Sequence, residues 1–132
     1  MHSVYVAQAM PNGIVKIGKS ITPFKRIAYL ASSTGLRLTL VRLYEFEKAS
    51  DCSLVEKYFH ELYAKHRHPF GNSIEWFTAE VAAMVPETIC PEKADMWLFR
   101  NVSRYTHRFK LVWSEKQRKK IRVEIGGYGF YK

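Results

Sequence analysis

A two-residue turn signal limits the fold of this chain more than any other feature. Asn12-Gly13 stands between two β-rich runs, residues 4–6 and 14–17, and Asn-Gly is the strongest short signal for a β-hairpin. A hairpin joins antiparallel strands, whereas parallel strands need a crossover of a dozen or more residues. We therefore expect an antiparallel pair of strands within the first twenty residues, with Lys16 on the second strand.

Two helices and a third strand are expected to follow this hairpin. Thr22-Pro23 is typical of a helix start, and Phe24, Ile27 and Ala31 would share one apolar face of that helix. Residues 38–46 read as a strand, and a second helix is expected from residue 50 or 51 to about residue 65. This order predicts an α+β fold in which helices flank a small three-stranded antiparallel sheet.

The basic residues are concentrated at one end of the chain. Residues 1–99 hold eleven Lys and Arg against ten Asp and Glu, whereas residues 100–132 hold ten against two. The net charge of +9 is therefore carried almost entirely by the last quarter of the sequence. Prolines at 86 and 91 mark a boundary, and we expect a first domain over residues 1–85 and an appendage over residues 86–132.

The appendage is expected to be a β-hairpin that contacts nucleic acid. Residues 109–113 and 121–125 alternate in the manner of strands, and a basic segment lies between them. Aromatic residues are interleaved with the charge, as in proteins that bind polyanions. The alternative is a solvated segment that only aids solubility. The residues expected at the nucleic acid are Lys116, Arg118, Lys119, Lys120 and Arg122.

Other features argue against a membrane or secreted protein. No apolar run approaches the roughly 18 residues that a membrane span needs, and the first residues lack the pattern of a signal peptide. Cys52 and Cys90 read as reduced thiols rather than as a disulfide framework. We expect a cytoplasmic protein without a membrane partner.

One motif in the sequence points to a function that its context excludes. Residues 13–20 match the phosphate-binding loop pattern G-x-x-x-x-G-K-[ST]. The interior of that loop should be small and flexible, but here it is the strand-forming run 14–17. The motif should also open a helix, and Pro23 would interrupt the first turns of such a helix. We expect no nucleotide site there.

The same segment fits a different pattern. Ser3-Val4-Tyr5 is followed by Lys16-Ile17-Gly18, then by Arg26, and by Glu56 and His60 four residues apart, with Glu75-Trp76-Phe77 further on. This set, in this order and spacing, resembles the GIY-YIG nuclease superfamily, and in particular its phage T5 Orf172/Mug113 branch, over roughly residues 3–84. Two positions depart from the superfamily pattern: Ser3 replaces the glycine of GIY, and Lys16 replaces the tyrosine of YIG.

The resemblance implies a phosphodiester-cleaving site. Its catalytic residues would be Tyr5, Lys16, Arg26, Glu56 and His60. Glu56 would bind one Mg²⁺ or Mn²⁺ ion, since a single carboxylate with waters and phosphate oxygens suits these ions. The planar guanidinium of Arg26 would bind phosphate oxygens, and Tyr5 would orient or deprotonate the attacking water if nearby cations lowered its pKa.

The other two positions have more than one interpretation. His60 would contact phosphate, shuttle a proton or be structural. Lys16 would stabilise charge in place of the missing tyrosine, or would mark a site that binds without cutting. Lys19, in the same segment, is expected to contact nucleic acid.

Three functions are compatible with these features. The first is a metal-dependent endonuclease acting on duplex DNA, which the set of Tyr5, Arg26 and Glu56 favours. The second is a catalytically silent DNA-binding module of the same fold, which Lys16 and the basic appendage would equally suit. The third is a protein-binding adaptor or inhibitor whose basic hairpin meets an acidic partner.

Overall fold

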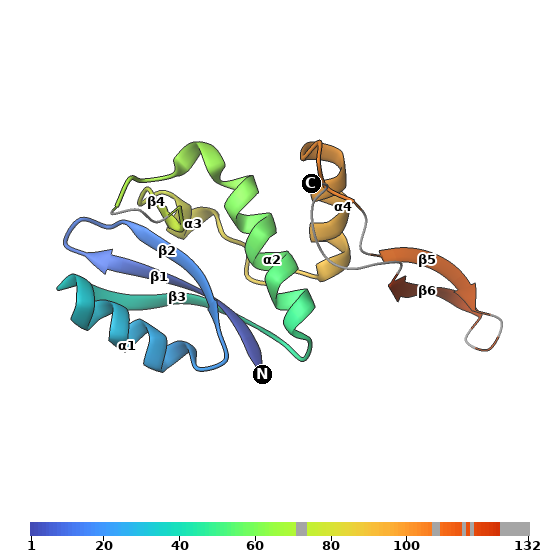
Figure 1. Ribbon diagram of the computed structural model, residues 1–132, viewed down its shortest axis with the longest axis horizontal. Coiled ribbons are helices and arrows are strands. Elements are labelled where there is room, and N and C mark those ends of the chain that lie inside the picture. Colours follow the sequence, from blue (N-terminus) through green and yellow to red (C-terminus); the bar gives the residue numbers. More distant parts are fainter. Residues whose placement is uncertain (71–73, 107–108, 115, 117, 125–132) are drawn as a thin grey trace.

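The main body of the protein is a four-stranded antiparallel sheet with helices on both faces (Figure 1). A computed structural model describes residues 1–70, 74–106, 109–114, 116 and 118–124. The strand order is β3-β1-β2-β4. The elements of the body are β1 (His2–Met10), β2 (Val15–Ser20), α1 (Pro23–Thr34), β3 (Arg37–Phe46), α2 (Ala49–Leu62), a 3₁₀ turn (Ala64–His66), β4 (Trp76–Phe77), α3 (Val81–Met84) and α4 (Pro91–Asn101).

The first two strands form the predicted hairpin. β1 and β2 pair antiparallel from Ser3 opposite Ser20 to Gln8 opposite Val15. Gly13 in the turn has a φ of 78°, in the left-handed region that glycine adopts without steric cost. The phosphate-loop motif is therefore mostly a strand, as its context predicted, and α1 begins only at Pro23.

The prediction of three strands was wrong, because β4 adds a fourth strand to the edge of β2. Trp76 lies opposite Lys16, and Phe77 lies opposite Val15. β4 has only two residues, which is too short for a recognisable alternating pattern, and its partner is about sixty residues away in the sequence. Only the folded chain brings the two segments together.

The two faces of the sheet are covered by different helices. Alternate residues of β1 point to opposite faces, so Val4 and Val6 belong to the core beneath α2, whereas Tyr5 and Ala7 pack with α1. The helix α1 buries Ile27 and Leu30. Phe24, expected on that apolar face, is instead 66% exposed, because the buried stripe lies one residue earlier along the helix, with Leu30 buried and Ala31 only half-buried.

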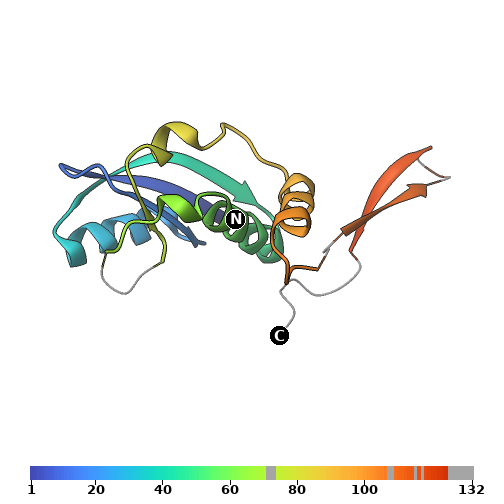
Figure 2. The same cartoon turned by 90° about the horizontal axis from the view of Figure 1, so that it is seen from above.

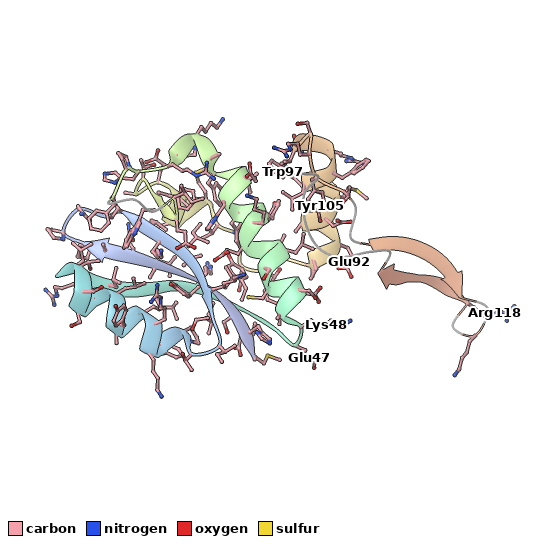
Figure 3. The ribbon with its side chains drawn as sticks, viewed as in Figure 1. Glu47, Lys48, Glu92, Trp97, Tyr105 and Arg118 are labelled. Atoms are coloured by element: carbon pink, nitrogen blue, oxygen red, sulfur yellow. The ribbon has the colours of Figure 1, made fainter. Side chains whose placement is uncertain are left out.

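The core extends beyond the boundary expected near residue 86. Ala94 and Leu98 of α4 are fully buried in the same core as the residues of α2. Trp97, labelled in Figure 3, meets Tyr58 of α2 edge to face at a centroid distance of 5.5 Å. Residues up to Tyr105 thus share the core of the sheet, and the division into 1–85 and 86–132 stays a prediction.

Two further strands pair outside the main sheet. β5 (Phe109–Ser114) and β6 (Lys119–Glu124) are antiparallel to each other and extend beyond α4, away from the four-stranded sheet, in both views (Figures 1 and 2). Arg118 lies at the far end of this pair (Figure 3). The side chains of both strands lie outside the described part of the structure, so the nucleic-acid-binding hairpin stays a prediction.

The helices of the body show no membrane-spanning character. Among the residues that the structure describes, no helix combines the length and the apolar composition needed to cross a bilayer.

The shared core predicts that α4 is needed for folding. Leu98→Ala should lower the free energy of unfolding by about 2–5 kcal/mol, as expected for truncation of a fully buried leucine. Met96→Ala, on the same helix but at a side chain that is 46% exposed, is the matched control and should cost less than about 1 kcal/mol. Urea unfolding measures both, and equal midpoints would show that α4 is not part of the core.

Candidate functional site

The site forms at the edge of β2, just beyond the point where β4 stops. β4 pairs only with Val15 and Lys16. At the next residue, the N–H of Ile17 donates a 3.0 Å hydrogen bond to the carbonyl of Glu75, and the carbonyl of Ile17 accepts a 2.8 Å bond from Nε2 of His60 on α2. One peptide position of β2 thereby holds the segment that carries Glu75 and the helix that carries Glu56 and His60.

Tyr5 reaches this edge by crossing over a glycine. Tyr5 lies opposite Gly18 in the β1–β2 pairing. A Cβ atom on Gly18 would lie 2.5 Å from the Tyr5 hydroxyl oxygen and 2.6 Å from its Cζ atom, well inside van der Waals contact. The Tyr5 ring therefore passes over β2 where that strand has no side chain. This close approach explains in physical terms the glycine of the Lys16-Ile17-Gly18 segment.

Arg26 meets the hydroxyl of Tyr5 from α1. The guanidinium lies close enough to the phenol to favour its charged form, and it also lies over the Tyr29 ring with Cζ 5.4 Å from the ring centroid. Burial nevertheless raises the pKa of Tyr5 above its usual value of 10, because the loss of hydration outweighs the effect of the neighbouring cation. Tyr5 is therefore a neutral phenol at pH 7, contrary to the lowered pKa that a role as general base would need.

Lys16 is buried and paired with a carboxylate. It is 4% exposed, and its ammonium contacts Oε2 of Glu75. The ammonium also lies 5.5 Å from the centroid of the Trp76 ring, within the range of a cation–π contact. A buried ammonium is stable only when it is paired, and Glu75 supplies that pairing.

The carboxylate of Glu56 is in an environment that disfavours its charged form. Its Oε2 atom is buried and has no hydrogen-bond partner in the described part of the chain. Burial, aided by the nearby charge of Glu75, raises the pKa of Glu56 from 4.5 to about 7, although Lys19 and Lys16 oppose the shift. A buried carboxylate oxygen without a donor is the arrangement that a cation would relieve.

His60 lies one helical turn after Glu56. Its hydrogen bond to Ile17 defines its protonation state. A carbonyl oxygen only accepts, so Nε2 must carry the proton that it shares with Ile17. Burial lowers the pKa of His60 below its usual value, and the ring is therefore neutral at pH 7. Nδ1 then carries no proton and is the nitrogen able to bind a metal ion or accept a proton.

Glu56, His60 and Glu75 make a group that fits a metal ion. One ligand atom each from Glu56, His60 and Glu75 lies within 4.8 Å of the other two. Two carboxylates and an imidazole suit Mg²⁺ or Mn²⁺ completed by water or phosphate oxygens. The hydrogen bond from His60 to a backbone carbonyl is the usual way in which a metal-binding histidine is oriented.

The structure brings together five of the residues singled out in the sequence. Tyr5, Lys16, Arg26, Glu56 and His60 come from four different elements and meet around the edge of β2.

The residues expected to bind nucleic acid are not members of this group, although Lys19 is close enough to Glu56 to act on its charge. Lys19 points along α2, where its ammonium donates a 2.8 Å hydrogen bond to Ser53 beside a pocket of about 230 Å³. Lys116 and Arg118 are exposed near the far end of the β5–β6 pair, and the side chains of Lys119, Lys120 and Arg122 lie outside the described part.

Sequence reasoning gave no role to Glu75 or Gly18. The signal for Glu75 was an acidic residue directly before an aromatic pair, but its position depends on a two-residue strand. The signal for Gly18 was present in the motif, although only the structure shows the Tyr5 ring above it.

Fold and site together define a small α+β protein with a charged group at a sheet edge. Residues 2–102 match the model of the T5orf172 domain family, and the chain belongs to that family. No curated protein and no solved structure matches the chain. The matched region includes α4 and ends close to the last residues of the shared core.

The raised pKa of Glu56 predicts that this residue destabilises the metal-free protein at high pH. The unfolded chain loses the Glu56 proton near pH 4.5 and the folded protein only near pH 7, so stability declines across that interval. At pH 8, Glu56→Gln should therefore unfold at a higher temperature than the wild type. Its free energy of unfolding should be higher by at most about 2–3 kcal/mol. At pH 4 the two proteins should differ little.

A neighbouring glutamate provides the control. Glu61→Gln alters a carboxylate on the same helix that pairs with Lys57 at 3.2 Å near the surface, and it should give no such gain at pH 8. Thermal unfolding in EDTA-treated buffer at the two pH values measures both variants. Equal or lower stability of Glu56→Gln at pH 8 would contradict the buried-charge interpretation.

Proposed function

We propose that this protein is a metal-dependent endonuclease of the GIY-YIG type that hydrolyses DNA phosphodiester bonds. The observation that supports the proposal most is the meeting of Tyr5, Arg26 and Glu56 at one sheet edge, although they lie on β1, α1 and α2. Membership of the T5orf172 family is consistent with a DNA-related role. A purely structural role leaves unexplained why the buried Oε2 atom of Glu56 has no hydrogen-bond partner among the residues that the structure describes.

The proposed division of labour follows the environment of each group. Glu56 and His60 would hold one Mg²⁺ or Mn²⁺ ion, which when bound would supply Lewis-acid activation of the phosphate. The exposed guanidinium of Arg26 binds a phosphate oxygen. Tyr5 orients the attacking water as a neutral phenol, since burial raises its pKa.

A nicking assay on supercoiled plasmid tests the proposal. With Mg²⁺ or Mn²⁺ the wild type should convert supercoiled to open-circular DNA, and EDTA should stop the conversion. Glu56→Ala should lower the rate by a factor of at least about 10² while most DNA affinity remains, because the residue holds the metal rather than the DNA. Glu61→Ala is the matched control on α2 and should cleave like the wild type.

Other results of these assays would contradict the proposal or favour a different function. Nicking by Glu56→Ala at the wild-type rate would remove Glu56 from the site. DNA binding without nicking in any metal would favour the silent binding module, for which the pairing of Lys16 with Glu75 is the supporting observation, because that lysine is held by protein rather than by substrate. Binding to neither DNA nor RNA would leave the protein-binding adaptor.

The basic end is proposed to supply most of the nucleic-acid affinity, largely without sequence preference. Residues 100–132 carry a net charge of +8, and Lys116 and Arg118 are exposed. A plot of log affinity for duplex DNA against log salt concentration has a slope of about −0.9 for each phosphate contact. Four or five contacts would therefore give a slope of about −4.

Replacing the five basic residues 116, 118, 119, 120 and 122 by Gln should flatten that slope toward zero and weaken binding to all sequences alike. Lys93→Gln on α4 is the single-charge control, with a slope change of at most about 1. Fluorescence anisotropy at several salt concentrations gives the slopes. An unchanged slope in the five-residue variant would show that the basic end is not the DNA-binding arm.

A further inference from the structure

The carboxylate of Glu75 belongs both to an ion pair and to the candidate metal group. Its Oε2 atom contacts the ammonium of Lys16, and the same side chain completes the possible metal group with Glu56 and His60. The catalytic roles proposed above assign no step to this ion pair or to Glu75. The two partners of the ion pair differ in solvent exposure, since the Lys16 side chain is 4% exposed and the Glu75 side chain is 34% exposed. The carboxylate therefore lies on the solvent side, where an incoming ion reaches it.

We propose that Lys16 and the metal ion bind Glu75 in alternation, so that metal binding releases the Lys16 ammonium to the substrate phosphate. The inference rests on the proposed function, because it assumes that a divalent ion binds at Glu56 and His60. In the metal-free protein, Lys16 supplies the positive charge that Glu75 needs. In the metal-bound protein, the ion supplies that charge, and Lys16 becomes the group that needs a new anionic partner.

Electrostatics makes simultaneous binding unfavourable. A divalent cation and an ammonium that contact the same carboxylate lie within a few ångströms of each other and repel strongly in a poorly hydrated site. Glu56 is fixed on a helix and His60 is fixed by its bond to Ile17. Lys16 carries a flexible side chain, so the lysine is the group that moves.

The neighbourhood of Lys16 provides a position for the released ammonium. The Trp76 ring already lies 5.5 Å from Nζ, and an aromatic face stabilises an ammonium that has lost its carboxylate. Lys16 is also the residue that stands in place of the second tyrosine of the superfamily pattern. The alternation makes its charge available to a phosphodiester only after the metal has bound, which orders the assembly of the site.

Metal affinity measured by Mn²⁺ electron paramagnetic resonance tests the alternation in the full chain. Lys16→Met removes the competitor and should tighten Mn²⁺ binding about tenfold, within the range of typical coupling between two sites. In a Glu75→Gln background the same substitution should have little effect, because the shared carboxylate is absent.

Lys19→Met is the matched control for general electrostatics. Lys19 also acts on the charge of Glu56, but it donates to Ser53 rather than to Glu75. Lys19→Met should tighten binding clearly less than Lys16→Met. Equal effects of the two substitutions, or an equal effect of Lys16→Met with and without Glu75, would overturn the alternation.

A second measurement needs no substitution at Lys16. Binding of Mg²⁺ to the wild type should change tryptophan emission as the ammonium moves relative to Trp76, and Trp76→Phe should abolish the change while Trp97 and Trp113 remain. Saturable Mg²⁺ binding without an emission change assigned to Trp76 would also overturn the inference. Glu56→Ala distinguishes failure of the proposed metal site from failure of the alternation. If Glu56→Ala leaves Mn²⁺ affinity unchanged, the metal site is wrong. If Glu56→Ala loses Mn²⁺ affinity but Lys16→Met has no effect on it, only the alternation is refuted.

Discussion

The hydrogen bond between His60 and the carbonyl of Ile17 fixes the geometry on which the site depends. It ties α2 to the edge of β2 at 2.8 Å, and because the helix is rigid it also sets the position of Glu56 one turn away. The same bond selects the tautomer of His60 and leaves Nδ1 unprotonated. The shortness of β4 is the complementary condition, since a longer strand would continue along β2 past Lys16 and fill the edge that α2 and Glu75 now share.

The site concentrates groups that would be unfavourable elsewhere in a small protein. A buried lysine, a carboxylate with a pKa near 7 and a neutral buried histidine lie around one peptide of β2. Such groups reduce stability unless each is paired, and the core beneath α2 offsets the cost, with Phe59 stacked on Tyr63 and tilted against Tyr44. That core extends into α4 through Ala94 and Leu98.

The sequence predicted those parts of the fold that depend on local interactions. The hairpin at Asn12-Gly13 and the helix start at Pro23 follow from backbone preferences, and both are confirmed. The α+β class is also confirmed. Features that depend on distant partners were missed: β4 is too short to show a period, Glu75 acquires its place from β4, and the exposure of Phe24 depends on where the sheet meets α1. Tyr5, Arg26 and Glu56 could be named from the resemblance to the GIY-YIG superfamily, but the raised pKa of Tyr5 follows only from its burial.

The composite nature of the site has a consequence for synthesis of the protein. Lys16 and Glu75 are separated by 59 positions, and the strand that holds Glu75 pairs with β2 only when both have left the ribosome. Contacts of such long range form late, because the chain must close a large loop first. A partly made chain therefore contains the hairpin and α1 but no assembled charged group. The charged group forms only once the chain has been made past Phe77, the end of β4.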